Sequence, residues 1–184
     1  MSSKYKFLER EGVYFTTSTL VGWVDLFTRD IYRNIILESL QHCQRNQGLQ
    51  IHAWVMMTNH LHLICSIKNG GDLGQVMRNF KSYTAMKLID AVINNPKESR
   101  REWLLDLFEK HGKANSSNHR FQIWQHENHP FLLESEFFYN QRLNYLHYNP
   151  VVTGFVSEPY HWLYSSTNEY FNGIKGLLEL EILD

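Results

Sequence analysis

Two histidines separated by one residue, His60 and His62, are the residues of this sequence whose types and spacing most directly suggest chemistry. In a strand, alternate side chains leave the same face, so both imidazoles would project side by side. Two neutral imidazole nitrogens on a rigid strand can serve as ligands of a divalent ion. Alternating histidines can also be only the polar side of an amphipathic strand, so a third ligand is needed. His52 is a poorer candidate, because its register places it far from the turn that His60 adjoins.

A tyrosine and an asparagine in the second half, Tyr145 and Asn149, are four positions apart and would share one face of a helix. Tyr145 lies on the flank of that helix's apolar stripe, so its phenol can reach the sheet surface while the helix stays docked. Asn149 could offer an amide oxygen to a hard cation. The structural alternative is that Tyr145 buries its ring and that Asn149-Pro150 only ends the helix. The stripe consists of Tyr139, Leu143 and Leu146.

The elements that must position these residues follow from periodicity and from turn signals. Thr58-Asn59 separates two apolar runs by two residues, which predicts a β-hairpin. Pro150 predicts the end of the helix that carries Tyr145. The expected elements are strands at 12–20, 50–57, 60–67 and 120–126, and helices from Thr28 to about Asn46, from 72 to 94, from 103 to 108 and from 134 to 148.

This order of elements predicts an α+β fold, in which helices cover an antiparallel sheet, and a ferredoxin-like arrangement is the simplest candidate. With 184 residues and 43% hydrophobic content, the chain can form one core. We therefore expect a single domain over 1–184, with the C-terminal tail packed on the body. Cys43 and Cys65 are interpreted as small core residues.

Composition also limits the setting in which the protein acts. No run approaches the eighteen or so apolar residues of a membrane span, and the N-terminus lacks a signal peptide's apolar stretch, so a soluble cytoplasmic protein without a membrane partner is expected. The formal charge of −1 argues against nucleic acid unless basic groups gather on one face. The ten histidines soften that objection, because some could be charged near a polyanion.

Several blocks of the sequence together resemble one family. The hairpin from Ala53 to Ile64 resembles the His-hydrophobic-His (HUH) motif of the single-tyrosine transposases, and more narrowly of the REP-associated tyrosine transposases. Later blocks are similar to that family's in order and spacing: Trp124–Pro130, Leu143–Val151, Gly154–Val156 and Trp162–Ser166. The resemblance extends over nearly the whole chain.

The resemblance implies an HUH endonuclease fold, usually dimeric, that cleaves single-stranded DNA and transfers the strand through a 5′-phosphotyrosine. It implies Tyr145 as nucleophile, His60 and His62 as metal ligands, and Asn149 as the third ligand, with Mg²⁺ or Mn²⁺ as the ion. A phenol is mostly protonated at neutral pH and a phosphodiester repels anions, so such a site needs a nearby cation.

Three positions depart from the family pattern. Thr58 replaces the usual proline before Asn-His, which should affect only the rigidity of the turn. Val152 replaces a frequent basic residue and is followed by Thr153, which puts a DNA contact in doubt. Tyr148 is a competing phenol one turn away, although the four-residue offset from Asn149 favours Tyr145.

The implied partner is single-stranded DNA beside a folded hairpin, with a homodimer as the assembly. Aromatic and imidazole rings could stack on unpaired bases, and cations could contact phosphates. The stacking candidates are Trp124, His126 and His129, and the cationic candidates are Arg78, Lys81, Arg120 and Arg142. Trp124 could equally belong to the core, and Arg78 and Lys81 to a solvated helix surface.

Two other function classes stay open at this point. The near-neutral charge and Val152 are compatible with a domesticated, non-catalytic protein that binds DNA hairpins and regulates. A zinc-stabilised RNA-binding module is a third class, but the expected fourth tetrahedral ligand is missing.

Overall fold

A four-stranded antiparallel sheet forms the centre of the computed structural model, which describes residues 7, 9, 11–68, 70–114, 120–126 and 130–183. The strand order is β2-β3-β1-β4, which is the order of a ferredoxin-like sheet. The fold class predicted from the sequence is therefore confirmed. The strands are β1 (Tyr14–Thr19), β2 (Leu49–Met56), β3 (His60–Ile67) and β4 (Phe131–Leu132).

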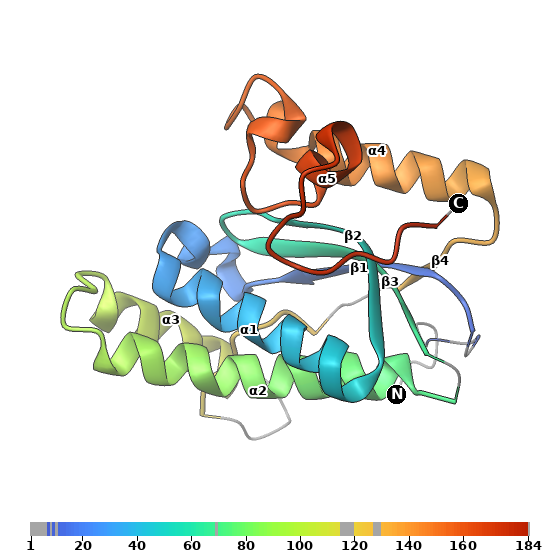
Figure 1. Ribbon diagram of the computed structural model, residues 1–184. Coiled ribbons are helices and arrows are strands. Elements are labelled where there is room, and N and C mark those ends of the chain that lie inside the picture. The colour runs from blue at the N-terminus through green and yellow to red at the C-terminus, as the bar shows by residue number, and fades with distance from the viewer. Residues whose placement is uncertain are drawn as a thin grey trace.

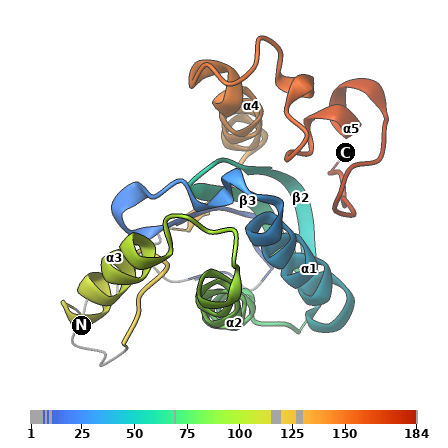
Figure 2. The same ribbon diagram turned by 90° about the vertical axis from the view of Figure 1, so that its left-hand side faces the viewer.

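Helices cover both faces of this sheet (Figures 1 and 2). On one face lie α1 (Asp30–Gln47) and α2 (Leu73–Asn94), with α3 (Arg101–Lys113) beside α2. On the other face lies α4 (Glu136–Val152), and the short α5 (Thr167–Asn172) lies near it. Three 3₁₀ turns complete the described elements: η1 (Val21–Trp23), η2 (Leu26–Thr28) and η3 (Pro159–His161).

The predicted β-hairpin is confirmed. Met57 N donates to His60 O over 2.8 Å, so Thr58 and Asn59 are the two turn residues. The strands then pair with Met56 opposite Leu61. A register shift between Ile51 and Ala53 marks a bulge further along β2.

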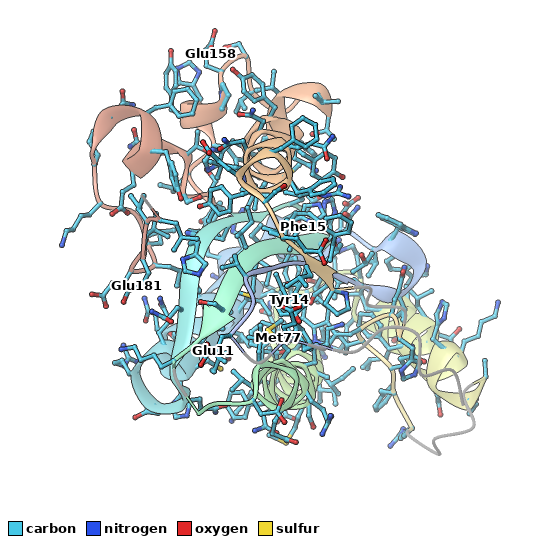
Figure 3. The ribbon with its side chains drawn as sticks, turned by 90° about the vertical axis from the view of Figure 1, so that its right-hand side faces the viewer. Glu11, Tyr14, Phe15, Met77, Glu158 and Glu181 are labelled. Atoms are coloured by element: carbon cyan, nitrogen blue, oxygen red, sulfur yellow. The ribbon has the colours of Figure 1, made fainter. Side chains whose placement is uncertain are left out.

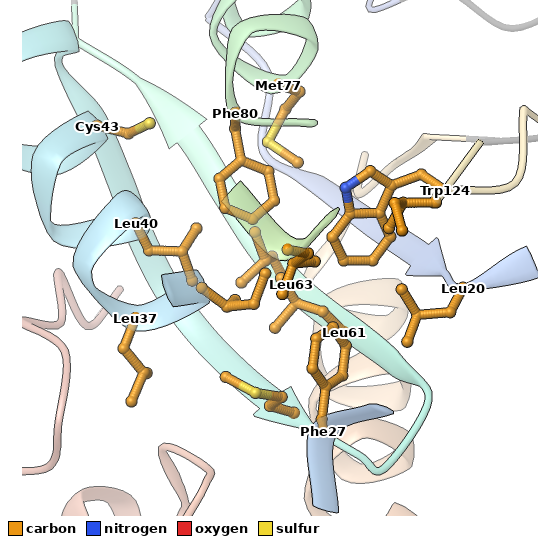
Figure 4. Close-up of a cluster of buried hydrophobic side chains, with 14 of the residues drawn as sticks. Leu20, Phe27, Leu37, Leu40, Cys43, Leu61, Leu63, Met77, Phe80 and Trp124 are labelled. Carbon is orange, nitrogen blue, oxygen red and sulfur yellow. The ribbon is translucent and has the colours of Figure 1, made fainter. Parts of the chain in front are cut away.

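Alternation along β3 separates two environments. Leu61, Leu63 and Cys65 belong to the large core beneath α1 and α2, part of which Figure 4 shows, whereas Ile64 belongs to a smaller core beneath α4. In β1, Tyr14 likewise points toward Met77 of α2, and Phe15 points toward α4 (Figure 3). The even-numbered residues of β3, which include both histidines, therefore share the α4 face.

Two of the expected elements differ from the structure: the strand at 120–126 and the end of the helix at Pro150. The segment 120–126 forms only an isolated bridge between Trp124 and Leu20, and the fourth strand lies later, at Phe131–Leu132. The burial of that segment does not alternate, because the adjacent residues Ile123 and Trp124 are both buried in the large core at the end of β1. Pro150 lies inside α4, which continues to Val152 because the bond from Thr153 N to Asn149 O closes the last turn.

Smaller differences concern the ends of two helices: α1 begins at Asp30 rather than at Thr28, and α3 spans thirteen residues rather than six. The C-terminal segment lies along β2, where Glu181 N donates to Ile51 O and Leu178 is buried in the large core. Within the part of the chain that the structure describes, no helix is long and apolar enough to cross a membrane.

Candidate active site

His60 and His62 leave the α4 face of β3 side by side. Their ring centroids are 4.7 Å apart, and the rings meet edge to face at 71°. His62 is buried, with 4% of its surface exposed, whereas His60 beside the turn is partly exposed. The spacing seen in the sequence thus brings two imidazoles together at one place on the sheet.

A neighbouring oxygen contacts Nδ1 of each imidazole. Thr17, the register partner of His62 on β1, places Oγ1 2.8 Å from His62 Nδ1. Asn59 Oδ1 lies 2.7 Å from His60 Nδ1. A carbonyl oxygen only accepts, so His60 donates from Nδ1 and its Nε2 keeps a lone pair. Oxygen partners of this kind fix the tautomer and orientation of metal-binding histidines.

Burial keeps both imidazoles uncharged at neutral pH. It lowers the pKa of His60 to about 4. It lowers the pKa of His62 to about 3, and the nearby Arg142 charge, together with His60 whenever His60 is protonated, acts in the same direction. Both rings can therefore offer lone pairs to a cation in the pH range where the protein would work.

Helix α4 brings Tyr145 and Asn149 over this histidine pair. The Tyr145 ring lies 5.4 Å from the His62 ring and 6.0 Å from the Phe15 ring, centroid to centroid, and half of its surface is exposed. Asn149 is buried, with Nδ2 3.5 Å from His62 Nε2. Its Oδ1 is buried and has no hydrogen-bond partner among the described residues. Such an atom is costly unless a ligand or water completes it.

Apolar packing and a C-terminal anchor hold α4 in this position. Tyr139, Leu143 and Leu146 pack on the smaller core, as their spacing predicted. Beyond the helix, Trp162 Nε1 donates to Met56 O over 3.0 Å. Ser166 then bonds to the Trp54 backbone and to His147 Nε2. The block from Trp162 to Ser166 therefore attaches the end of the tyrosine helix to β2.

Asp25, which the sequence reasoning missed, supports the turn that carries His60. Its Oδ1 accepts from Thr58 Oγ1 at 2.6 Å and from Asn59 Nδ2 at 3.1 Å. This contact directs the Asn59 amide so that its oxygen faces His60. Arg100 Nη1 in turn donates to the Asp25 carbonyl. Asp25 lies 34 positions before Asn59 in the sequence, so no local signal could have linked the two.

Arg142, one of the expected DNA contacts, lies beside this site on α4. Its guanidinium carbon is 5.3 Å from the Phe15 ring centroid, and Nε is buried without a hydrogen-bond partner among the described residues. Arg78 and Lys81 lie on α2, across the sheet. Trp124 is buried beneath α2 and donates Nε1 to Thr84, so its expected stacking on DNA does not fit this structure.

The remaining expected contacts lie after α3. Arg120 is exposed, 3.9 Å from Glu109. His126 is described, and His129 lies outside the described residues. Trp23, which was not anticipated, places its ring 6.2 Å from that of His60. His52 bonds to Ser66 and to the Glu181 carbonyl, away from the histidine pair.

The donor set around His62 fits a divalent cation. Two neutral imidazoles come from β3, and α4 adds the Asn149 amide, whose Nδ2 faces His62 and whose buried Oδ1 has no hydrogen-bond partner among the described residues. Among the described residues, no three His, Cys, Asp or Glu side chains gather where they could hold a metal, so the third protein ligand here would be the amide. A mixed nitrogen and oxygen set that leaves positions open suits an ion such as Mn²⁺ or Mg²⁺.

Comparison with known proteins finds one sequence family and two solved structures that are similar to this chain. Residues 24–110 match the sequence family described as "Transposase IS200 like". The whole chain matches 94% of a solved structure of a REP-associated tyrosine transposase bound to a REP hairpin, with a TM-score of 0.62 and 19% identity. A candidate transposase from Deinococcus radiodurans R1 is 14% identical, with a TM-score of 0.48, over 78% of this chain and 95% of its own. No curated protein matches the chain.

The resemblance to single-tyrosine transposases that the sequence motifs indicated is therefore confirmed. The match to an IS200-like transposase family includes the histidine hairpin, and the shared fold extends to α4 and the segment beyond it.

Proposed function

We propose that this protein is a cation-dependent DNA strand transferase, which cuts single-stranded DNA with Tyr145 and keeps the 5′ end as a phosphotyrosine. One observation carries the proposal: α4 places a half-exposed phenol and a buried amide against His62, although some 80 residues or more separate them in the chain. Histidines that served only as the polar side of a strand would not need either group.

His60, His62 and Asn149 are the residues that would hold the ion. The buried Asn149 Oδ1, which has no partner among the residues that the structure describes, and the two neutral imidazoles support this assignment. When bound, Mg²⁺ or Mn²⁺ would polarise the scissile phosphate and stabilise charge on its oxygens. Calorimetry with MnCl₂ alone, without DNA, tests the site directly. We expect saturable binding of one ion by wild type and its loss in Asn149→Ala, whereas equal binding by both would exclude Asn149 as a ligand.

Tyr145 supplies the nucleophile. Its hydroxyl oxygen forms a bond to phosphorus and loses its proton, while the bond from phosphorus to the 3′ oxygen breaks and that oxygen leaves as a hydroxyl. One phosphodiester replaces another, so the 3′-hydroxyl of another strand can reverse the step without ATP. Arg142, whose buried Nε has no partner among the described residues, is suited to contact the same phosphate.

The DNA partner we propose is a single strand next to a folded hairpin. The relative of known structure was solved with a REP hairpin, which supports this choice. The open surface around Tyr145 and His60 would accept an extended strand. We further expect the protein to act in the cytoplasm.

A labelled hairpin oligonucleotide with single-stranded flanks, incubated in Mn²⁺, separates catalysis from binding alone. Wild type should form an adduct that survives denaturing electrophoresis, and Tyr145→Phe should form none while binding the hairpin equally well. Tyr148→Phe, one turn along α4, is the matched control and should keep the adduct. Equal binding with no adduct from wild type would favour the alternative, a non-catalytic hairpin-binding regulator, with which the net charge of −1 is compatible.

The homodimer implied by the resemblance stays a prediction. Tyr145 and His62 meet within one chain, so a protomer holds all four proposed groups by itself. Light scattering of the protein alone and with the hairpin would measure the assembly. Mixing Tyr145→Phe with His62→Ala would then test exchange of tyrosine helices, because activity returns only if a partner supplies the phenol.

A further inference from the structure

Trp23 combines two unfavourable features next to the histidine pair. It is 61% exposed, and it adopts a left-handed backbone with φ of 52°. Bulky residues seldom adopt positive φ, because the side chain then crowds its own backbone. Among the described residues, Trp23 is the one non-glycine residue with this conformation. Strain of this kind persists where surrounding contacts enforce it, and it often marks a functional position.

The contacts that enforce it belong to the site itself. Asn59 Nδ2 donates to Trp23 O over 3.3 Å, while the oxygen of the same amide accepts from His60. Trp23 N donates to Leu20 O at the end of β1. The preceding Gly22 is also left-handed, and its backbone lies so close to Leu107 of α3 that a Cβ there would lie 3.2 Å from the leucine side chain. A single asparagine therefore fixes both the tryptophan backbone and the His60 imidazole.

The ring is held beside the proposed phosphate position and remains open to solvent. Its centroid lies 6.2 Å from that of His60, at an interplanar angle of 73°. An indole has a large flat surface, and burying it is favourable for any planar partner. In a single strand, each base next to a phosphate is joined to it through one sugar. A base next to a phosphate at His60 would thus fall within reach of this ring.

We propose that Trp23 is a stacking platform for an unpaired nucleobase that flanks the scissile phosphate. The proposal rests on the function proposed above, and it adds a contact that positions the strand. Stacking on an aromatic side chain tolerates any base, because every base has a flat face. It contributes about 5- to 150-fold in affinity per base. Trp23 would therefore set the register of the strand by position rather than by sequence.

The test asks whether removing the Trp23 ring and removing one particular base have the same effect on binding. Binding is measured in the Tyr145→Phe background, so that cleavage does not interfere, with oligonucleotides that carry one abasic site at each unpaired position in turn. One position should weaken binding by about 5- to 150-fold when Trp23 is present, and should have no further effect in Trp23→Ala. Trp23→Phe should keep part of the effect. Tyr83→Ala, which removes an exposed aromatic residue from α2 across the sheet, should keep all of it.

Three outcomes decide between the proposals. If every abasic site has the same effect in Trp23→Ala as with Trp23 present, the stacking proposal is overturned. If the coupled position is not adjacent to the phosphate that wild type cleaves, the assignment to the flanking base is overturned. If the coupling is present and wild type forms no adduct, the stacking stands and the catalytic proposal fails.

A second variant keeps the test independent of folding. Trp23→Gly and Trp23→Ala both remove the ring, but glycine adopts positive φ without strain. Trp23→Gly should therefore unfold at a higher temperature than Trp23→Ala, while the two bind every oligonucleotide equally. Binding that follows thermal stability across the two variants would contradict a contact between the ring and DNA.

Discussion

The two faces of strand β3 are built from adjacent residues and perform different tasks. Leu61, Leu63 and Cys65 close the large core against α1 and α2, and each is at most 1% exposed. His60 and His62 alternate with them and lie beneath α4, where Tyr145 is half exposed and the oxygen of Asn149 has no hydrogen-bond partner within the described part of the chain. One face is closed by apolar packing, whereas the other carries the polar groups that we propose bind a cation and DNA. A strand can thus hold reactive groups rigidly because its opposite face is closed.

Removing an imidazole should have the largest effect, and it should be confined to function. His60→Ala would remove a ligand of the proposed cation, and formation of the covalent adduct should fall by about a thousandfold or more, since an ion of this kind would contribute several kcal/mol to the transition state. The free energy of unfolding should change by about 1 kcal/mol or less, because His60 is partly exposed. Adduct rates and urea denaturation of the same samples measure both. If His60→Ala unfolded as easily as it lost activity, the two faces of β3 would not carry separate roles in stability and in catalysis.

Truncating the neighbour on the opposite face should have the converse effect. Leu63→Ala leaves a cavity in the large core and should lower the free energy of unfolding by about 2–5 kcal/mol. The fraction that stays folded should keep its metal binding and a near-normal adduct rate. Denaturation midpoints and rates measured well below the melting temperature provide the comparison. A folded Leu63→Ala protein without activity would mean that the faces are coupled.

Acid should destabilise the α4 face through its buried histidines. Burial lowers the pKa of His147 to about 4, so the unfolded chain takes up a proton below about pH 6.5 while the folded chain does not. Stability from this group is therefore present above about pH 6.5 and decreases as pH falls toward 4, by up to about 3 kcal/mol. In His147→Asn, the free energy of unfolding should depend less steeply on pH across that window, as measured by urea titrations at several pH values. An unchanged slope would mean that His147 is charged in the folded protein.

Substituting Asp25, which supports the turn that carries His60, should have the smallest effect of these changes on metal affinity and adduct rate. Asp25→Ala removes the acceptor that directs the Asn59 amide toward His60, and metal affinity or adduct rate should fall by about 10- to 100-fold. Asp25→Asn keeps one amide oxygen at the same place and should recover part of the loss. Calorimetric titration with Mn²⁺ separates this positioning role from a general loss of structure. If Asp25→Ala bound Mn²⁺ with normal affinity, Asp25 would not position the metal-binding residues.

The sequence predicted those parts of the site that depend on local periodicity. Strand alternation placed His60 beside His62, and helical spacing placed Tyr145 and Asn149 on one face, so each pair could be recognised without coordinates. Contacts between distant segments were beyond such reasoning, and Asp25 and Trp23 were missed for that reason. The end of α4 was predicted too early at Pro150, because a proline removes one backbone hydrogen bond of the helix but does not prevent the helix from continuing for another half turn. Trp124 was ambiguous because an aromatic residue in an alternating segment suits a core as well as a DNA surface.

Mass-spectrometric mapping of the covalent adduct tests the central claim most directly. Wild type is incubated with a hairpin oligonucleotide and Mn²⁺, digested with a nuclease and a protease, and searched for a residual nucleotide on a tyrosine. The arrangement of α4 over His62 predicts that the modification lies on Tyr145 and depends on added metal. A nucleotide found on Tyr148, or an adduct that forms equally well in EDTA, would contradict the account.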